Sequence, residues 1–160
     1  MRLAHIMPVN ASEERKERVW KKLKQVVHPD TEIDIIDYEN GPDDLEYYVD
    51  DVKAIQLMLD DRERLARYDG ISIACFYDPG FRELREALEI PVMGIGFASM
   101  SLANTLGSRS TVIVGRNKWI PKMSDNCLIY GFNKNISNWR SVGLTVQQLK
   151  TEKELTRRRI

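Results

Sequence analysis

Hydrophobic and polar positions in the first part of the chain alternate between two patterns. Short apolar runs are typical of strands, and longer stretches with an apolar residue every three or four positions are typical of amphipathic helices. We expect strands at residues 3–9, 31–39, 69–76 and 90–97. We expect helices at residues 10–27, 45–68 and 79–89. The strict alternation predicts a three-layer α/β/α fold with a mainly parallel sheet and right-handed crossovers.

The alternation continues less regularly in the rest of the chain. We expect a helix at 99–107, a strand at 110–115, a helix around 118–126, and a last helix at 145–160 that Thr145 caps. Residues 128–144 show no clear period. The pattern therefore predicts two pseudo-symmetric lobes, a first α/β lobe at 1–97 that carries Cys75 and a partial second α/β lobe at 98–160.

Composition narrows the class of protein. The 160 residues are 42% hydrophobic and 30% charged, as in an ordinary globular protein. No apolar run reaches the roughly 18 residues that cross a bilayer, and the start MRLAHIMPVN is too short for a secretory signal. Cys75 and Cys127 lie far apart and lack the spacing of metal ligands. We therefore expect a cytoplasmic protein with no disulfide framework, no metal site and no membrane partner.

Charge is balanced over the whole chain but unevenly placed. Residues 1–100 carry 13 Lys and Arg against 21 Asp and Glu, a net charge of −8, and residues 101–160 carry 11 against 3, a net charge of +8. Such asymmetry would suit a basic arm for nucleic acid, but the basic residues are scattered, so we expect no nucleic-acid partner. Attraction between the two halves, or a basic region over an anionic small molecule, explains the asymmetry better.

Candidate site residues follow the expected strands, because ligands of parallel α/β sheets bind beyond the carboxyl ends of the strands. These candidates are Asn10, Ser12, Cys75, Phe76, Gly94, Gly96, Ser99 and Arg116. Cys75 is the strongest candidate among them for a catalytic role. Close to a helix N-terminus its thiol would have a lowered pKa and react as a thiolate. The alternative is a small buried hydrophobic residue, which is the interpretation we favour for Cys127, at an expected strand start.

The stretch GIGFAS after the fourth strand superficially resembles a phosphate loop. It is not GxGxxG, because Ser99 replaces the third glycine, and no Walker lysine follows. We interpret it as a tight strand-to-helix turn whose backbone N–H groups hold a carboxylate or an imide oxygen. Arg116 either makes a charged contact with a ligand or is an ordinary solvated arginine on the surface. A nucleotide-binding module is disfavoured because no acidic residue follows the fifth strand at the ribose-binding position.

The segment ACFYDPGFRELREALEIPVMGIGFASMSLANTLGSRSTVIVG resembles the first catalytic segment of the hydantoin and allantoin racemases, in the aspartate/glutamate racemase superfamily. HIMPVNAS is a looser match to the first strand and Asn-containing loop of that family. The pairing of Cys-x-x-Asp-Pro with Ile-Pro-Val-x-Gly carries the resemblance. Cys75 matches the first cysteine of the family, Asn10 the polar loop residue, and Gly96 and Ser99 the turn after the fourth strand.

This resemblance implies cofactor-independent racemisation of a small molecule such as a hydantoin, allantoin or an amino-acid derivative. Two cysteines then face each other across a cleft, one removing a proton alpha to a carbonyl and the other returning a proton. The second cysteine of the family follows a helix similar to 145–160, so we expect a chain truncated before it, and a homo-oligomer. The alternative is an inactive relative that binds a small carboxylate or carbonyl ligand without turnover.

Overall fold

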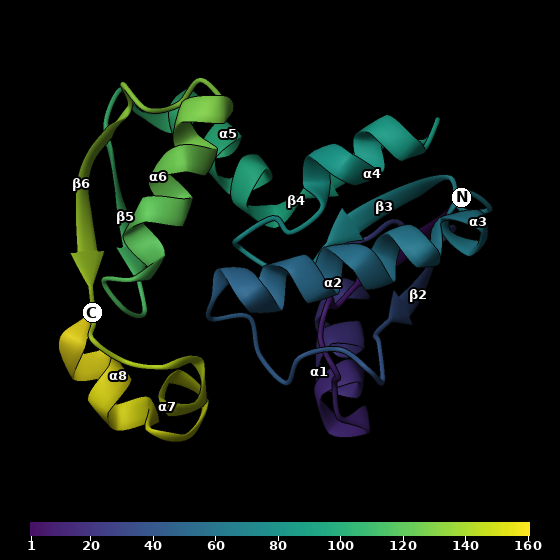
Figure 1. Ribbon diagram of the computed structural model, residues 1–160, viewed down its shortest axis with the longest axis horizontal. Coiled ribbons are helices and arrows are strands. Elements are labelled where there is room, and N and C mark those ends of the chain that lie inside the picture. Colours follow the sequence, from purple (N-terminus) through teal and green to yellow (C-terminus); the bar gives the residue numbers. More distant parts are fainter. The chain divides into compact units, whose positions relative to one another are not determined.

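In the computed structural model, which describes residues 1–160, the first four apolar runs pair in one parallel sheet (Figure 1). The strands are β1 (Arg2–Ile6), β2 (Glu32–Ile36), β3 (Gly70–Ile73) and β4 (Val92–Gly94). Their order across the sheet is β2-β1-β3-β4. The expected parallel sheet is therefore confirmed.

Helices cover both faces of this sheet (Figure 1). They are α1 (Glu13–Leu23), α2 (Tyr48–Asp60), α3 (Arg62–Leu65) and α4 (Phe81–Ala87). The connection from β1 to β2 steps one way across the sheet, and the connection from β2 to β3 steps back past β1. Right-handed crossovers in opposite directions place α1 on one face and α2 on the other. The sequence thus produces the expected α/β arrangement of a parallel sheet between helices.

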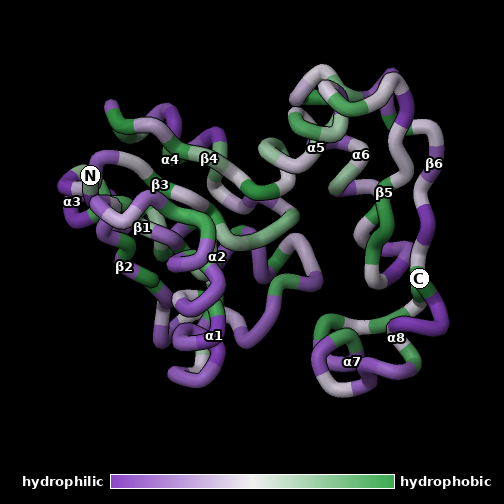
Figure 2. Tube along the Cα trace, turned by 180° about the vertical axis from the view of Figure 1, so that it is seen from behind, coloured by the Kyte–Doolittle hydropathy of each residue, from purple (hydrophilic) through white to green (hydrophobic).

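The core of this part of the chain is concentrated on one side of the sheet. Ala4, Ile6 and Ile73 are fully buried, as are Met58 of α2 and Leu84 of α4. By contrast, α1 contributes no buried residue, and Figure 2 shows it as a largely hydrophilic helix. Among these helices, the buried apolar residues therefore come from α2, α3 and α4.

The chain divides into two compact units, Met1–Ile95 and Gly96–Ile160. The second unit is built on a parallel pair of strands, β5 (Ser110–Val114) and β6 (Ile136–Ser141). Its helices are α5 (Ile95–Leu106), α6 (Trp119–Ile129), α7 (Val146–Thr151) and α8 (Lys153–Arg159). Val112, Val114, Met123 and Leu144 form its core. The description as two pseudo-symmetric lobes at 1–97 and 98–160 stays a prediction.

Two expectations about local structure are corrected, and one segment without an expected element contains a strand. The helix expected at 45–68 is divided at Asp61 into α2 and α3, and the helix expected at 145–160 is divided at Glu152. Residues 128–144, which have no clear period, contain β6. Thr145 does cap α7, accepting a hydrogen bond from the backbone N–H of Gln148 at 3.1 Å. No helix combines the length and the apolar character that crossing a bilayer requires.

Candidate functional site

The carboxyl ends of β1 and β3 form the switch point of the first sheet, where successive connections leave in opposite directions. Ile6 of β1 pairs with Ile73 of β3, and the backbone N–H of Ala74 donates to the carbonyl of Ile6 at 2.7 Å. The loops that begin at Met7 and Ala74 therefore leave the sheet at the same edge. In open α/β sheets this is the place where ligands bind.

The loop after β1 is held in place by backbone hydrogen bonds to the loop after β2. The N–H of Asn10 donates to the carbonyl of Pro42 at 2.9 Å, and the N–H of Tyr38 donates to the carbonyl of Val9 at 3.2 Å. Gly41 permits this approach, because a Cβ there would lie 2.8 Å from the carbonyl oxygen of Tyr38. The side chain of Asn10 is left exposed at the sheet edge.

Ser12 has a structural task at the same edge. It is the N-cap of α1, and its hydroxyl accepts a hydrogen bond from the backbone N–H of Arg15 at 3.3 Å. Next to it, the N–H of Ala11 donates to the carboxylate of Asp37 at 3.2 Å, and Lys16 donates to the same carboxylate at 3.1 Å. The cap and the carboxylate together fix the start of α1 beside the loop that carries Asn10.

Cys75 lies in the turn that follows β3 and is half-buried. The backbone N–H of Asp78 donates to the carbonyl of Cys75 at 3.0 Å, which closes the turn. Phe76, beside the thiol in sequence, is 36% exposed. The helix that follows, α4, begins at Phe81 with Gly80 as its N-cap, and the expected lowering of the Cys75 pKa by a helix N-terminus stays a prediction.

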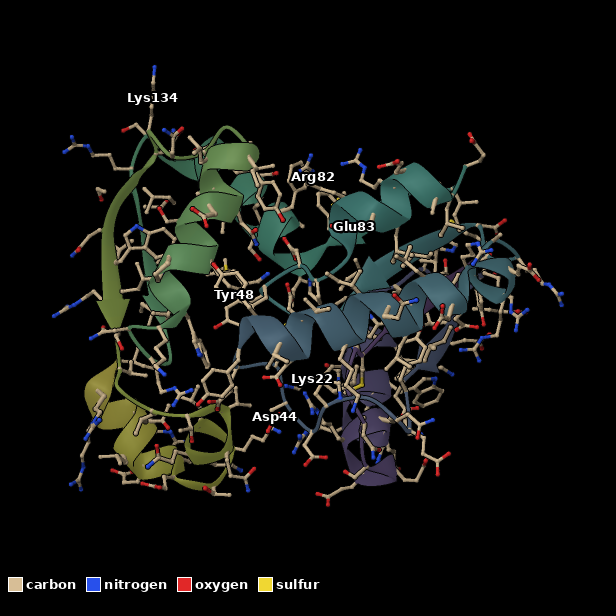
Figure 3. All side chains as sticks on the ribbon, viewed as in Figure 1. Lys22, Asp44, Tyr48, Arg82, Glu83 and Lys134 are labelled. Carbon is tan, nitrogen blue, oxygen red and sulfur yellow. The ribbon has the colours of Figure 1, made fainter.

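Two further residues of this edge were not among the candidate site residues. Asp78 is a buried carboxylate that adopts a left-handed backbone conformation, with a φ of 51°. Tyr48 stands at the beginning of α2, which follows β2, and its side chain is 54% exposed (Figure 3). The DPG sequence did signal a turn at Asp78, but nothing in the sequence signals that its carboxylate is buried.

Gly94 is the last residue of β4 and is buried. It belongs to this edge because it pairs with Ile73 of β3. A Cβ at Gly94 would lie 2.4 Å from both Cγ and Oδ1 of Asp78. Glycine is therefore required here for close packing, independent of any ligand.

The remaining candidates belong to the second unit. Gly96 and Ser99 lie in the first turns of α5, which begins at Ile95 directly after β4, so the strand passes into the helix at Gly94 and most of GIGFAS is helical. Arg116 follows β5 and is half-buried.

Cys127 also belongs to the second unit and lies inside α6, not at a strand start as expected. Its packing role is confirmed, since its side chain is 1% exposed and its thiol contacts the Met100 sulfur at 3.3 Å. Burial raises the pKa of the Cys127 thiol to about 11. The thiol therefore stays protonated at neutral pH.

Comparisons with known proteins agree with this architecture. Residues 5–160 match the model of the family described as Asp/Glu/Hydantoin racemase. A hydantoin racemase from Pseudomonas sp. (strain NS671) is 28% identical over 82% of this chain and 53% of its own length. The structure of an allantoin racemase from Klebsiella pneumoniae is 26% identical, with a TM-score of 0.86 over 99% of this chain and 65% of the other.

An allantoin racemase from Pseudomonas fluorescens has the same fold, with a TM-score of 0.90 at 22% identity over all of this chain and 68% of the other. The chain thus spans between half and two thirds of the length of most of these relatives. The family model covers nearly the whole chain. The protein belongs to the Asp/Glu/hydantoin racemase family.

Proposed function

We propose that the protein acts as a cofactor-independent isomerase in which the thiolate of Cys75 removes a proton from a carbon alpha to a carbonyl. The substrate class is a small carbonyl compound such as a hydantoin, allantoin or an amino-acid derivative. The position of Cys75 carries the proposal, because its half-buried thiol follows β3 at the switch point of the sheet. The names of the matching hydantoin and allantoin racemases support the substrate class.

The chemistry needs a base, an acceptor for the electron pair and a source for the returned proton. The C–H bond of the substrate breaks, its proton goes to Sγ of Cys75, and the electron pair moves to the carbonyl oxygen as an enolate. Hydrogen-bond donors stabilise this oxyanion, and the exposed amide of Asn10 stands at the same sheet edge. Gly94 leaves room at that edge for the side chain of Asp78, and the exposed part of Phe76 provides an apolar surface for the substrate.

Inversion needs a second acid that returns the proton to the opposite face of the enolate. Cys127 does not suit this role, because it is buried and its pKa of about 11 keeps it from exchanging protons readily at neutral pH. Within the second unit we assign Gly96, Ser99 and Arg116 to substrate binding. Arg116 supplies a positive charge for a carboxylate or a polarised carbonyl.

Exchange of the substrate proton with solvent tests the role of Cys75. A 5-substituted hydantoin is incubated with the protein in D2O, and loss of the C5 proton is followed by NMR and corrected for spontaneous exchange. Cys75→Ser should lower the protein-dependent rate about 1,000-fold, because a hydroxyl is a far weaker acid than a thiol. The matched control, Cys127→Ser, should keep the rate within about three-fold. Exchange that survives Cys75→Ser would contradict the proposal.

Protection from alkylation separates turnover from binding. Iodoacetamide is applied at several pH values with and without the hydantoin, and the modified cysteine is located by peptide mass spectrometry. Protection of Cys75 together with exchange supports an isomerase. Protection without exchange favours the alternative, a relative that binds a carbonyl or carboxylate ligand without turnover. A Cys75 that reacts slowly and without protection means that the residue serves packing alone.

A further inference from the structure

Asp78 is a buried carboxylate that the proposed proton transfer does not use. It is 6% exposed, and Asp51 is the only other charged residue of the chain that is buried. Burying a carboxylate is unfavourable unless other groups of the fold stabilise it in place. The surroundings of Asp78 therefore indicate what the residue does.

The backbone of Asp78 closes the turn that presents the thiol. Its N–H donates to the carbonyl of Cys75 at 3.0 Å, and its own carbonyl accepts from the N–H of Phe81 at 3.3 Å. Its φ of 51° makes it the only residue other than glycine with a positive φ in the chain. Asp and Asn tolerate this left-handed region better than other residues with a side chain. Asp78 thus connects the carbonyl of Cys75 to the first residue of α4.

The side chain of Asp78 is fixed by a contact with a different strand. Its carboxylate lies where the side chain of residue 94 would be, because a Cβ on Gly94 would come within 2.4 Å of Cγ and Oδ1. A shift of Gly94 would disrupt the hydrogen bonds between β4 and β3, because the register of these strands pairs Gly94 with Ile73. The turn is therefore held at both ends, by β3 before Cys75 and by β4 under Asp78.

We infer that Asp78 is a positioning residue, whose left-handed turn and carboxylate seated over Gly94 fix the direction in which the Cys75 thiol is presented. The inference rests on the proposed function, in which that thiol is the base. Proton transfer is sensitive to placement, and a displacement of about 1 Å is sufficient to lower a rate about 100-fold. A rigid turn of this kind serves such a reaction better than a mobile loop.

Variants at Asp78 and Gly94 test this inference without unfolding the turn. Asp78→Gly keeps the positive φ and removes the carboxylate, whereas Asp78→Asn keeps both the conformation and the shape of the side chain. Gly94→Ala leaves the turn residues unchanged and forces the carboxylate away. Glu89→Gln, at an exposed carboxylate of the α4–β4 connection, is the charge control.

The readout is the rate constant for alkylation of Cys75 by iodoacetamide as a function of pH, measured without substrate. Buried Cys127 reports any general opening of the fold in the same samples. We expect Asp78→Gly and Gly94→Ala to change the Cys75 rate constant about five-fold or more, and Asp78→Asn and Glu89→Gln to keep it within about two-fold. If Gly94→Ala also exposes Cys127, that variant has opened the fold, and the inference is then tested by comparing Asp78→Gly with Asp78→Asn.

Two results would overturn the inference. In the first, Asp78→Gly reacts like the wild type, so the carboxylate is not needed. In the second, Asp78→Asn departs as far as Asp78→Gly, so the charge acts and the shape does not. Failure of the proposed function gives a different pattern, a wild-type Cys75 that no hydantoin protects. The two failures are therefore distinguishable in one set of samples.

Discussion

The two cysteines of the chain occupy opposite kinds of environment. Cys75 lies in a turn at the carboxyl edge of a four-stranded parallel sheet and is half-buried. Cys127 lies inside α6, is almost completely buried and contacts Met100. Under the proposed function, position relative to the sheet edge, and not residue type, separates the thiol that takes part in chemistry from the thiol that packs.

The strongest test of this comparison is the relative alkylation of the two thiols in the native protein. With a pKa of about 11, Cys127 is thiolate in only about one molecule per thousand at pH 8. Its burial also blocks the reagent. We expect Cys75 to react with iodoacetamide at least about 1,000-fold faster than Cys127, as measured by peptide mass spectrometry.

Unfolding in urea provides the control for that experiment. Both cysteines should then react at similar rates, because the burial that protects Cys127 is lost. Comparable rates in the native protein would break the comparison. They would mean that α6 opens often enough to expose its interior.

A second test uses the raised pKa of Cys127 as a probe of stability. Burial keeps the thiol protonated in the folded state up to about pH 11, whereas the unfolded chain loses this proton above its ordinary value of 9.0. The contribution of this thiol to the free energy of unfolding is therefore fully present below pH 9 and is lost as the pH rises through 11. The expected loss is about 2 to 3 kcal/mol for two pKa units.

The measurement is urea unfolding of the wild type and of Cys127→Val between pH 8 and pH 11. Other groups titrate in the same range, so the informative quantity is the difference between the two proteins. Cys127→Val should lose less stability on going to high pH, because valine has no proton to release. Parallel losses in both proteins would mean that burial of this thiol does not control its ionisation.

The sequence was a good guide to the first sheet and to the placement of Cys75. Interior parallel strands are apolar on both faces, so the run 69–76 and its neighbours were recognisable from composition alone. Strand β6 was missed because its segment ISNWRS is polar, and all six of its residues remain at least partly exposed. The end of α7 at Glu152 has no glycine or proline to mark it.

The role of Asp78 was beyond the sequence for a different reason. A DPG triplet predicts a turn, but the burial of the carboxylate depends on Gly94, which belongs to the next strand. That contact exists only after β4 has paired with β3. Long-range packing of this kind leaves no local pattern in the sequence, so nothing in the sequence links Asp78 to Gly94.

The smallest expected effect concerns Ser12, which is a candidate for substrate binding and also the N-cap of α1. Ser12→Ala should lower the free energy of unfolding by about 1 kcal/mol, because the N–H of Arg15 loses its acceptor. Ser12→Asp should restore stability, since aspartate is an equally good cap and its charge suits the helix N-terminus. Urea unfolding checks both variants.

Hydantoin protection of Cys75 in the same two variants separates the cap from the binding role. If Ser12 only caps the helix, Ser12→Asp should protect like the wild type. If its hydroxyl contacts the ligand, a carboxylate at this position would weaken protection even though the helix is restored. A stable Ser12→Asp variant without protection would therefore return Ser12 to the substrate site, beside Asn10 on the loop that leaves β1.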